Sequence, residues 1–248
     1  MNNISARDMT ARQYHEFMLA SESDRGTRAM FQQAVLSRLS PGASIFDFGA
    51  GSGIDAKAYG EHGHRVHAYD SSTEMQETFS DYCRSEMATG RIKLVSLPFG
   101  EFLKQDRIGD DRLDAITANF AVLNLIPGHA PLFRAFDRWL SPNGFILIGV
   151  ISPYHLTDAR YAWWWRHLGE LVFRGQYDLR TGDDLSHRFG VSALKRAAAP
   201  YFRLEGLVRS APRKVPARNL ASPASETDLC GPLFLCTHRF IFLLFRRH

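Results

Sequence analysis

Three glycines and two aspartates in the first third of the chain have the types and spacing of a ligand site. Residues 45–53 read Ile-Phe-Asp-Phe-Gly-Ala-Gly-Ser-Gly, with glycine at positions 49, 51 and 53. Glycines between a strand and a helix let polar ligand atoms approach bare backbone at the helix N-terminus. Asp70 follows at about the spacing at which an acid in such sites binds ribose hydroxyls. The pattern predicts a site for a ligand that carries a ribose.

The spacing of these glycines separates the classes of nucleotide ligand. A dinucleotide site has the pattern G-x-G-x-x-G, which would need a third glycine where this chain has Ile54. Asp47, beside the turn, would repel a pyrophosphate but can accept hydrogen bonds from an ammonium group. A nicotinamide- or flavin-binding oxidoreductase is therefore a weaker alternative. A non-catalytic cofactor-binding partner subunit remains a further one.

Alternating strands and helices are expected to position these residues. Hydrophobic periodicity predicts strands at 45–48, 66–69, 92–97, 114–120 and 145–151, with helices at 54–61, 72–87 and 130–140 and a turn at 141–144. Such an alternation predicts an α/β, Rossmann-like doubly wound sheet with helices on both faces. Ligands then bind at the carboxyl ends of the strands.

The flanking segments are expected to complete a single domain, 1–248. Residues 1–40 form an N-terminal helical cap with helices at 6–20 and 28–39, and residues 41–152 form the cofactor-binding core. Residues 153–190 are predicted to be an inserted aromatic lid, with a helix at 161–168 followed by a polar, irregular loop from 171 to 189. Residues 191–248 supply a closing helix at 191–199 and strands at 202–208 and 239–245, joined by an extended connection over 210–232.

Three consecutive indoles, at residues 163–165, stand out in the aromatic helix. Successive helical residues turn by about 100°, so the three rings cannot share one face. At least one is expected to point away from the main core.

The segment Asp47-Phe-Gly-Ala-Gly-Ser-Gly53 resembles the first motif of class I S-adenosylmethionine-dependent methyltransferases, of the small-molecule, type 11-like group. The resemblance covers residues 40–152 well and the remainder loosely. It implies a seven-stranded, mostly parallel sheet whose final pair of strands is antiparallel to the rest. It also implies S-adenosylmethionine as the cofactor.

The same resemblance assigns roles to individual positions. Met75 is expected to pack against the adenine, and Phe99 to stack on it, because Pro98 lacks the usual polar side chain. Asn119, Phe120 and Asn124 would lie nearest the reacting methyl group. The full set of expected cofactor residues is Asp47, Gly49, Ala50, Gly51, Gly53, Asp70, Ser71, Met75, Phe99, Asn119, Phe120 and Asn124.

Methyl transfer from a sulfonium is an in-line displacement, which needs a base only where the acceptor must lose a proton. His155, just beyond the fifth predicted strand, is the first candidate base, and His129, after the fourth, is the second. Tyr14, Tyr154 and Trp164 are expected to line the substrate site, and Arg28 is a further candidate. No metal site is expected, since His62 and His64 have no ligand partner at a suitable spacing.

Composition limits the cellular context and the redox state. The chain has 248 residues, of which 45% are hydrophobic and 23% are charged, and it has three cysteines without a C-x-x-C spacing. An odd number of cysteines argues against a disulfide framework and a zinc site, and favours a cytoplasmic protein. No secretory signal and no apolar run of about 18 residues is found, so no transmembrane segment is expected.

Charge and aromatic content bear on the acceptor. Residues 1–150 carry 15 Lys and Arg against 18 Asp and Glu, or −3, whereas residues 151–248 carry 15 against 8, or +7. Aromatic covering segments and a basic C-terminal part favour a small aromatic, polyketide-like, lipid-like or carrier-bound acceptor, methylated on oxygen or carbon. Peripheral contact with a membrane stays open, as does the oligomeric state. The base-amine methyltransferase signature Asn/Asp-Pro-Pro-aromatic is missing, since residues 119–122 read Asn-Phe-Ala-Val, and no specific nucleic-acid partner is expected.

Overall fold

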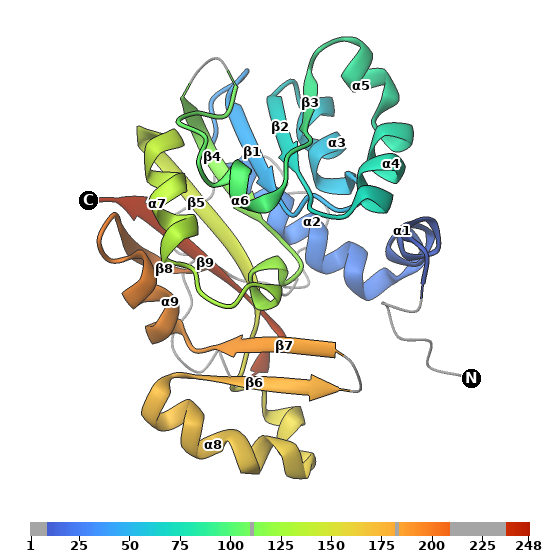
Figure 1. Cartoon of the computed structure of the whole chain (residues 1–248). Helices are drawn as coiled ribbons and strands as arrows, with labels where there is room; N and C mark the ends of the chain where they lie inside the picture. Colours follow the sequence, from blue (N-terminus) through green and yellow to red (C-terminus); the bar gives the residue numbers. More distant parts are fainter. Residues whose placement is uncertain (1–8, 110–111, 182–183, 209–236) are drawn as a thin grey trace, which may run out of the picture.

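A computed structural model describes residues 9–109, 112–181, 184–208 and 237–248. Within these residues the main sheet has seven strands in the order β3-β2-β1-β4-β5-β9-β8 (Figure 1). Neighbouring strands from β3 to β5 are parallel, and β9 is antiparallel to both of its neighbours. The strands are β1 Ser44–Phe48, β2 Arg65–Tyr69, β3 Ile92–Val95, β4 Leu113–Ala118, β5 Leu140–Ile151, β8 Phe202–Val208 and β9 Phe240–Arg247. The predicted Rossmann-like, mostly parallel sheet is confirmed.

Helices cover both faces of this sheet, because its strands are apolar on both sides. In β5, Ile146 and Ile148 pack into one core, whereas Phe145 and Leu147 pack into the other. Successive side chains of a strand point to opposite faces of the sheet, so a strand that is apolar on both faces contributes side chains to two cores. The first core is covered by α6 Phe99–Phe102, α7 Ala130–Trp139 and α9 Val191–Ala198, and the second by α2 Glu22–Leu36, α3 Ile54–Glu61 and α4 Thr73–Tyr82.

The N-terminal helices lie beside the end of the sheet that carries the glycine turn (Figure 1). Helix α1, Ala11–Ala20, begins with a capping box formed by Thr10 and Gln13. The Ser21 hydroxyl accepts from the Asp24 amide, so α2 begins at Glu22, several residues earlier than predicted. A hydrogen bond of 2.8 Å between His15 Nδ1 and Ser52 Oγ joins α1 to the turn after β1.

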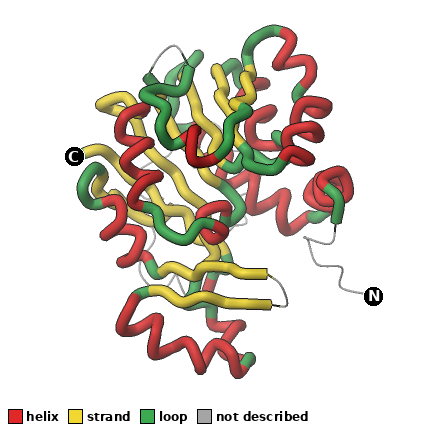
Figure 2. Tube along the Cα trace, in the orientation of Figure 1, coloured by secondary structure: helices red, strands yellow, loops and turns green. Residues whose placement is uncertain are grey.

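The segment after β5 differs most from the prediction. The short helix η2, Leu156–Arg160, precedes α8, Ala162–Arg174, which ends at Gly175 in the left-handed conformation with φ 73°. The predicted irregular loop at 171–189 is wrong: these residues finish α8 and then form an antiparallel hairpin of β6 Gln176–Thr181 and β7 Asp184–Phe189 (Figure 2). Tyr177 of β6 stacks on His167 of α8, whereas Phe189 of β7 packs against His129. Each strand is thus stabilised by burial on a different face of the hairpin.

Three smaller differences concern element boundaries, and one concerns strand direction. The helix predicted at 72–87 is divided at Cys83 into α4 and α5, Arg84–Ala88. The turn predicted at 141–144 belongs to an irregular start of β5, where pairing with β4 shifts between Leu113 and Ala115. Of the final two strands only β9 runs antiparallel to the rest, because β8 is in turn antiparallel to β9. The strand predicted at 92–97 ends at Val95, and the connection predicted at 210–232 lies outside the described residues.

In the part of the chain that the structure describes, no helix combines the length and apolar character needed to cross a bilayer.

Candidate functional site

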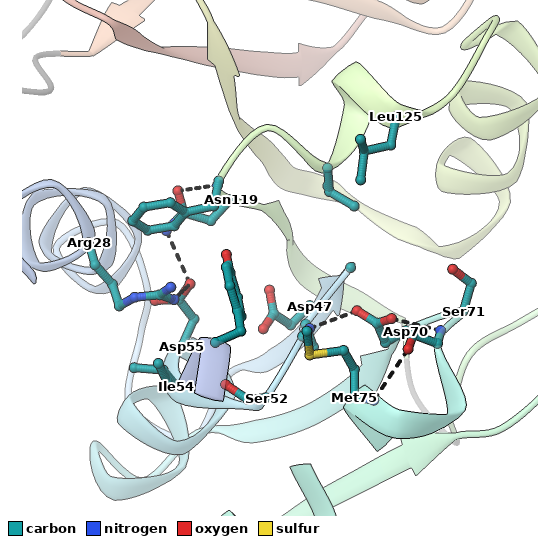
Figure 3. Close-up of a pocket in the computed structure, with 17 residues that line it drawn as sticks. Arg28, Asp47, Ser52, Ile54, Asp55, Asp70, Ser71, Met75, Asn119 and Leu125 are labelled. Atoms are coloured by element: carbon teal, nitrogen blue, oxygen red, sulfur yellow. Dashed lines mark hydrogen bonds and ion pairs between the residues drawn. The ribbon is translucent and has the colours of Figure 1, made fainter. Parts of the chain in front are cut away.

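A cavity of about 500 Å³ opens at the carboxyl ends of β1, β2 and β4 (Figure 3). Its walls come from the two N-terminal helices, the glycine turn, the turn after β2 and the loop after β4. They are formed by Tyr14, Arg28, Asp47, Gly49, Ala50, Gly51, Ser52, Ile54, Asp55, Asp70, Ser71, Ser72, Met75, Asn119, Phe120, Val122 and Leu125. The volume lies in the range of small-molecule and cofactor sites.

The three glycines of the turn have left-handed backbones, with φ of 70°, 53° and 86° at Gly49, Gly51 and Gly53. A Cβ atom at Gly49 would overlap Val122, and one at Gly53 would overlap Cys83 and Phe79. A Cβ atom at Gly51 would meet no protein atom within 4 Å, and Gly51 lines the cavity. Gly49 and Gly53 are therefore required by packing, whereas Gly51 keeps space open for a ligand.

Asp70 is held rigidly at the end of β2. Its Oδ2 accepts from the Gly51 amide at 2.8 Å and its Oδ1 from the Ser72 amide at 2.9 Å. Burial raises the pKa of Asp70, while the amide donors act against the shift. Each carboxylate oxygen has two lone pairs, so this group still has capacity to accept from two hydroxyl groups of a ligand.

Asp47 is a buried acid with one unsatisfied oxygen. Thr117 Oγ1 donates to its Oδ1 at 2.8 Å, but Oδ2 is buried without a hydrogen-bond partner. Burial and the nearby Asp55 carboxylate raise the pKa of Asp47 to about 7. A buried oxygen that lacks a donor is costly, and an ammonium group in the cavity would supply one. This orphaned oxygen fits the amino-acid part of S-adenosylmethionine.

Asp55, which the sequence reasoning did not select, is the centre of a charged network (Figure 3). Its Oδ2 accepts from Arg28 Nη1 at 2.5 Å and from Asn119 Nδ2 at 3.1 Å, and its Oδ1 accepts from Gln32 Nε2 at 2.7 Å. The Arg28 guanidinium also lies 4.3 Å from the centre of the Phe120 ring. The network joins α2, α3 and the end of β4. In the sequence, the available signal for Asp55 was its position in the first helical turn after the glycine motif.

The loop after β4 has a strained backbone. Phe120 and Ala121 have φ of 48° and 63°, values that residues with a Cβ rarely adopt. The Phe120 amide donates to Asn119 Oδ1 at 2.8 Å, and the Ala121 amide to the Gly149 carbonyl at 3.0 Å. These bonds hold the loop so that Phe120 and Val122 face the cavity. Strain of this kind is concentrated at functional sites.

Three of the predicted cofactor residues lie away from the cavity lining. Gly53 caps α3 and packs beneath it on Phe79. The Phe99 ring packs in the aromatic cluster with Phe48 and Phe102. Asn124 is buried, donating to the His187 carbonyl at 2.5 Å and accepting from the Ile151 amide at 3.1 Å, so it ties the loop after β4 to the hairpin and to β5.

The two candidate bases and two of the predicted substrate residues also lie elsewhere. His155 contacts Thr157 at 2.8 Å, and His129 bonds through Nε2 to the Leu123 carbonyl at 3.0 Å and faces a different cavity. Tyr154 and Trp164 line a further cavity beside α8. Of the predicted substrate residues, Tyr14 lines the main cavity, together with Asp47, Gly49, Ala50, Gly51, Asp70, Ser71, Met75, Asn119 and Phe120 from the predicted cofactor set. No cluster of three or more metal-ligating side chains is found among the described residues.

A mostly parallel sheet of this strand order, with a glycine turn after β1 and an acid after β2, defines the class I methyltransferase fold. The chain belongs to the methyltransferase-domain family, whose model matches residues 21–192. The predicted family is confirmed, and with it S-adenosylmethionine as the cofactor. Among curated proteins, none shows significant sequence similarity to this chain.

Solved structures with low sequence identity have the same fold. The 1,6-didemethyltoxoflavin-N1-methyltransferase of Burkholderia thailandensis, solved with 1,6-didemethyltoxoflavin and S-adenosylhomocysteine, is 17% identical, with a TM-score of 0.60 over 96% of this chain and 84% of that one. The CcbJ methyltransferase of Streptomyces caelestis is 16% identical, with a TM-score of 0.59 over 90% and 89% of the two chains. A TehB-like S-adenosylmethionine-dependent methyltransferase of Corynebacterium glutamicum is 14% identical, with a TM-score of 0.57 over 96% of each.

Proposed function

We propose that this protein methylates an oxygen or carbon atom of a small aromatic, polyketide-like or lipid-like acceptor. The observation that carries the proposal is the apolar wall after β4, where Phe120, Val122 and Leu125 face the cavity. Leu125 is 55% exposed, so its side chain is accessible to a ligand in the cavity. Burial of such surface against an apolar or aromatic acceptor is favourable. The Burkholderia methyltransferase was solved with the small molecule 1,6-didemethyltoxoflavin, which is consistent with a small acceptor here.

The charges around the cavity support one orientation of the cofactor. Asp70 would accept from the ribose hydroxyls, and the orphaned oxygen of Asp47 would accept from the ammonium group. Arg28 is the one lysine or arginine in the described lining, and its Nε is buried without a hydrogen-bond acceptor. The cofactor's carboxylate would supply that acceptor. Met75 would contact the adenine.

The chemistry then depends mainly on positioning. The bond between sulfur and the methyl carbon breaks as the bond from the acceptor atom forms, which leaves S-adenosylhomocysteine and a proton. No histidine is among the described residues that line this cavity. Neither His155 nor His129 is therefore assigned the role of a base. The tyrosine in the described lining is Tyr14, whose pKa is raised by burial, so its phenol stays protonated at neutral pH.

The first prediction concerns Asp47 and pH. Because the pKa of Asp47 is about 7 without cofactor, the carboxyl is neutral below that pH and attracts a cation only above it. We expect the affinity for S-adenosylmethionine to rise by about fivefold between pH 6 and 7, because the ionised fraction of a carboxyl with a pKa of about 7 rises from about a tenth to a half over this range. Calorimetric titrations across this range measure the effect.

The Asp47→Asn variant is the matched test, since its side-chain carbonyl can still accept from Thr117 but cannot ionise. Its affinity should be weak and nearly independent of pH. The Asp114→Asn variant is the control, because Asp114 accepts from the Ser44 amide at the opposite end of the sheet. Equal pH profiles for the wild-type protein and Asp47→Asn would contradict the assignment of the ammonium group to Asp47.

The second prediction concerns the acceptor. Incubation with methyl-labelled S-adenosylmethionine and a panel of phenols, polyketide-like enols, fatty acids, peptides and oligonucleotides should label only members of the first three groups. With the best acceptor, Leu125→Ser should raise KM about fivefold and leave the Kd for S-adenosylmethionine unchanged, since only apolar contact with the acceptor is lost. Production of S-adenosylhomocysteine gives the rates.

Labelling confined to peptides or oligonucleotides would refute the proposed acceptor class. Cofactor binding without turnover on any acceptor would favour the non-catalytic partner subunit instead. A Leu125→Ser variant with an unchanged KM would show that the wall after β4 does not contact the acceptor.

A further inference from the structure

A second cavity, of about 410 Å³, lies between α8, η2 and the start of α9. It shares no lining residue with the cofactor cavity. Its floor and sides are apolar, formed by Leu156, Trp164, Leu168, Leu171, Val172 and Phe173. Both cavities fall in the size range of small-ligand sites, so the second one needs an explanation of its own.

One end of this cavity is polar and positively charged. The end of α8 meets the first turn of α9 there, where Arg196 Nη2 donates to the Arg174 carbonyl at 3.3 Å. A Cβ atom at Gly175 would lie 3.1 Å from Ser192 Oγ and 3.3 Å from Arg196 Nη2, which shows how closely these groups converge. Neither Arg174 nor Arg196 forms an ion pair with a carboxylate in the described part of the chain. Two guanidiniums that have no ion-pair partner among the described residues therefore border an apolar cavity.

The apolar side of the cavity is open to solvent. Phe173 is 89% exposed and Val172 is 69% exposed, and both line the cavity. Trp164 is fixed by a 3.2 Å bond from its Nε1 to the Pro153 carbonyl, so its ring is held as a rigid wall. A ligand with an apolar body would cover the exposed rings, and an anionic group at its end would reach the arginines.

We propose that this cavity is a second ligand site, which binds an amphipathic monoanion with a carboxylate and an acyl or aryl body. Charge complementarity favours an anion over a neutral apolar molecule, because Arg174 and Arg196 have no acid partner among the residues that the structure describes. The aliphatic and aromatic lining favours an elongated apolar body over a free inorganic anion. The site is separate from methyl transfer, so it stands or falls independently of the acceptor proposed above.

The test uses the full-length protein saturated with S-adenosylhomocysteine and monomeric decanoate as the probe. Calorimetry is expected to show saturable binding of one decanoate per chain. Decan-1-ol, with the same chain and no charge, and butyrate, with the charge and little apolar surface, should each bind at least about tenfold more weakly. The Gly51→Val variant, whose cofactor cavity is blocked, should bind decanoate as tightly as the wild-type protein does without S-adenosylhomocysteine.

Two sets of variants separate the polar and apolar contributions. The double variant Arg174→Gln, Arg196→Gln should weaken decanoate binding about tenfold and leave decan-1-ol unaffected. Its matched control is Arg166→Gln, Arg203→Gln, which removes two exposed arginines that do not line the cavity. Phe173→Ser, at a position too exposed to disturb folding, should weaken both probes about threefold.

Several results would overturn the proposal. These are the absence of saturable binding, equal affinity for decanoate and decan-1-ol, an unchanged affinity in the arginine double variant, or loss of binding in Gly51→Val. A concentration-dependent dimer in analytical ultracentrifugation that Phe173→Ser abolishes would mean that a second copy covers this surface. Binding to vesicles of anionic phospholipid without binding of monomeric decanoate would assign the surface to a membrane.

Discussion

The Gly51→Val variant is expected to lose measurable affinity for S-adenosylmethionine while it stays folded. The left-handed backbone at Gly51 points the missing Cβ into the cavity, where no protein atom lies within 4 Å. A valine there would fill the space in which the cofactor approaches the turn, and it would strain the bond from the Gly51 amide to Asp70. Calorimetry measures the binding, and circular dichroism together with thermal melting measures the folding.

Gly63→Val is the matched control for the backbone strain. Gly63 also has a positive φ, of 86°, and also has no atom near its absent Cβ, but it lies in the turn before β2, outside the cavity. The two variants should lose similar stability, about 1–2 kcal/mol for the left-handed conformation, and only Gly51→Val should lose the cofactor. Normal binding by folded Gly51→Val would show that the turn has only a structural role.

The second large effect is expected for Asp55→Ala, which should lower the free energy of unfolding by about 3–5 kcal/mol. The side chains of Arg28 and Asp55 are 12% and 5% exposed, so removal of the acid leaves a largely buried guanidinium without its partner. Gln32 and Asn119 lose an acceptor at the same time. Urea unfolding followed by circular dichroism gives the change in stability.

The exposed pair Arg84 and Asp81 provides the comparison. Their side chains are 78% and 66% exposed, and solvent screens the pair, so Asp81→Ala should cost about 1 kcal/mol or less. Asp55→Ala should also reduce methyl transfer, because Arg28 and Asn119 both face the cavity. Equal losses of stability in the two variants would show that the network around Asp55 is not stabilised by burial.

Local patterns made much of the fold predictable. The motif from Asp47 to Gly53 depends on a few consecutive residues, and the structure brings most of it together with Asp70 and Met75 in one cavity. The strands β1, β2, β4 and β5 are apolar runs separated by helices, a pattern that is typical of a parallel sheet. The resemblance adds the number of strands and their mostly parallel direction, whereas the order of the strands comes from the structure.

What could not be predicted depends on contacts between distant segments. Many helices have an acid in the first turn, so Asp55 is not distinctive in the sequence. Its pairing with Arg28 depends on the packing of α2, which no local sequence pattern indicates. The hairpin was missed because β6 and β7 bury opposite faces, so neither strand is apolar enough to stand out between charged residues. Tyr177 and Leu179 do alternate with polar residues, and that alternation was the available signal.

The place of β9 in the sheet has a consequence for biosynthesis. Among the described strands β9 comes last along the chain, yet it lies between β5 and β8. During translation, β5 is therefore completed about ninety residues before β9 emerges from the ribosome. Until then β5 lacks its second neighbour, and β8 lacks the strand with which it pairs. An unpaired apolar edge of this kind attracts other chains. We expect the nascent protein to depend on chaperones during that interval, and its folding to finish only after β9 has closed the edge.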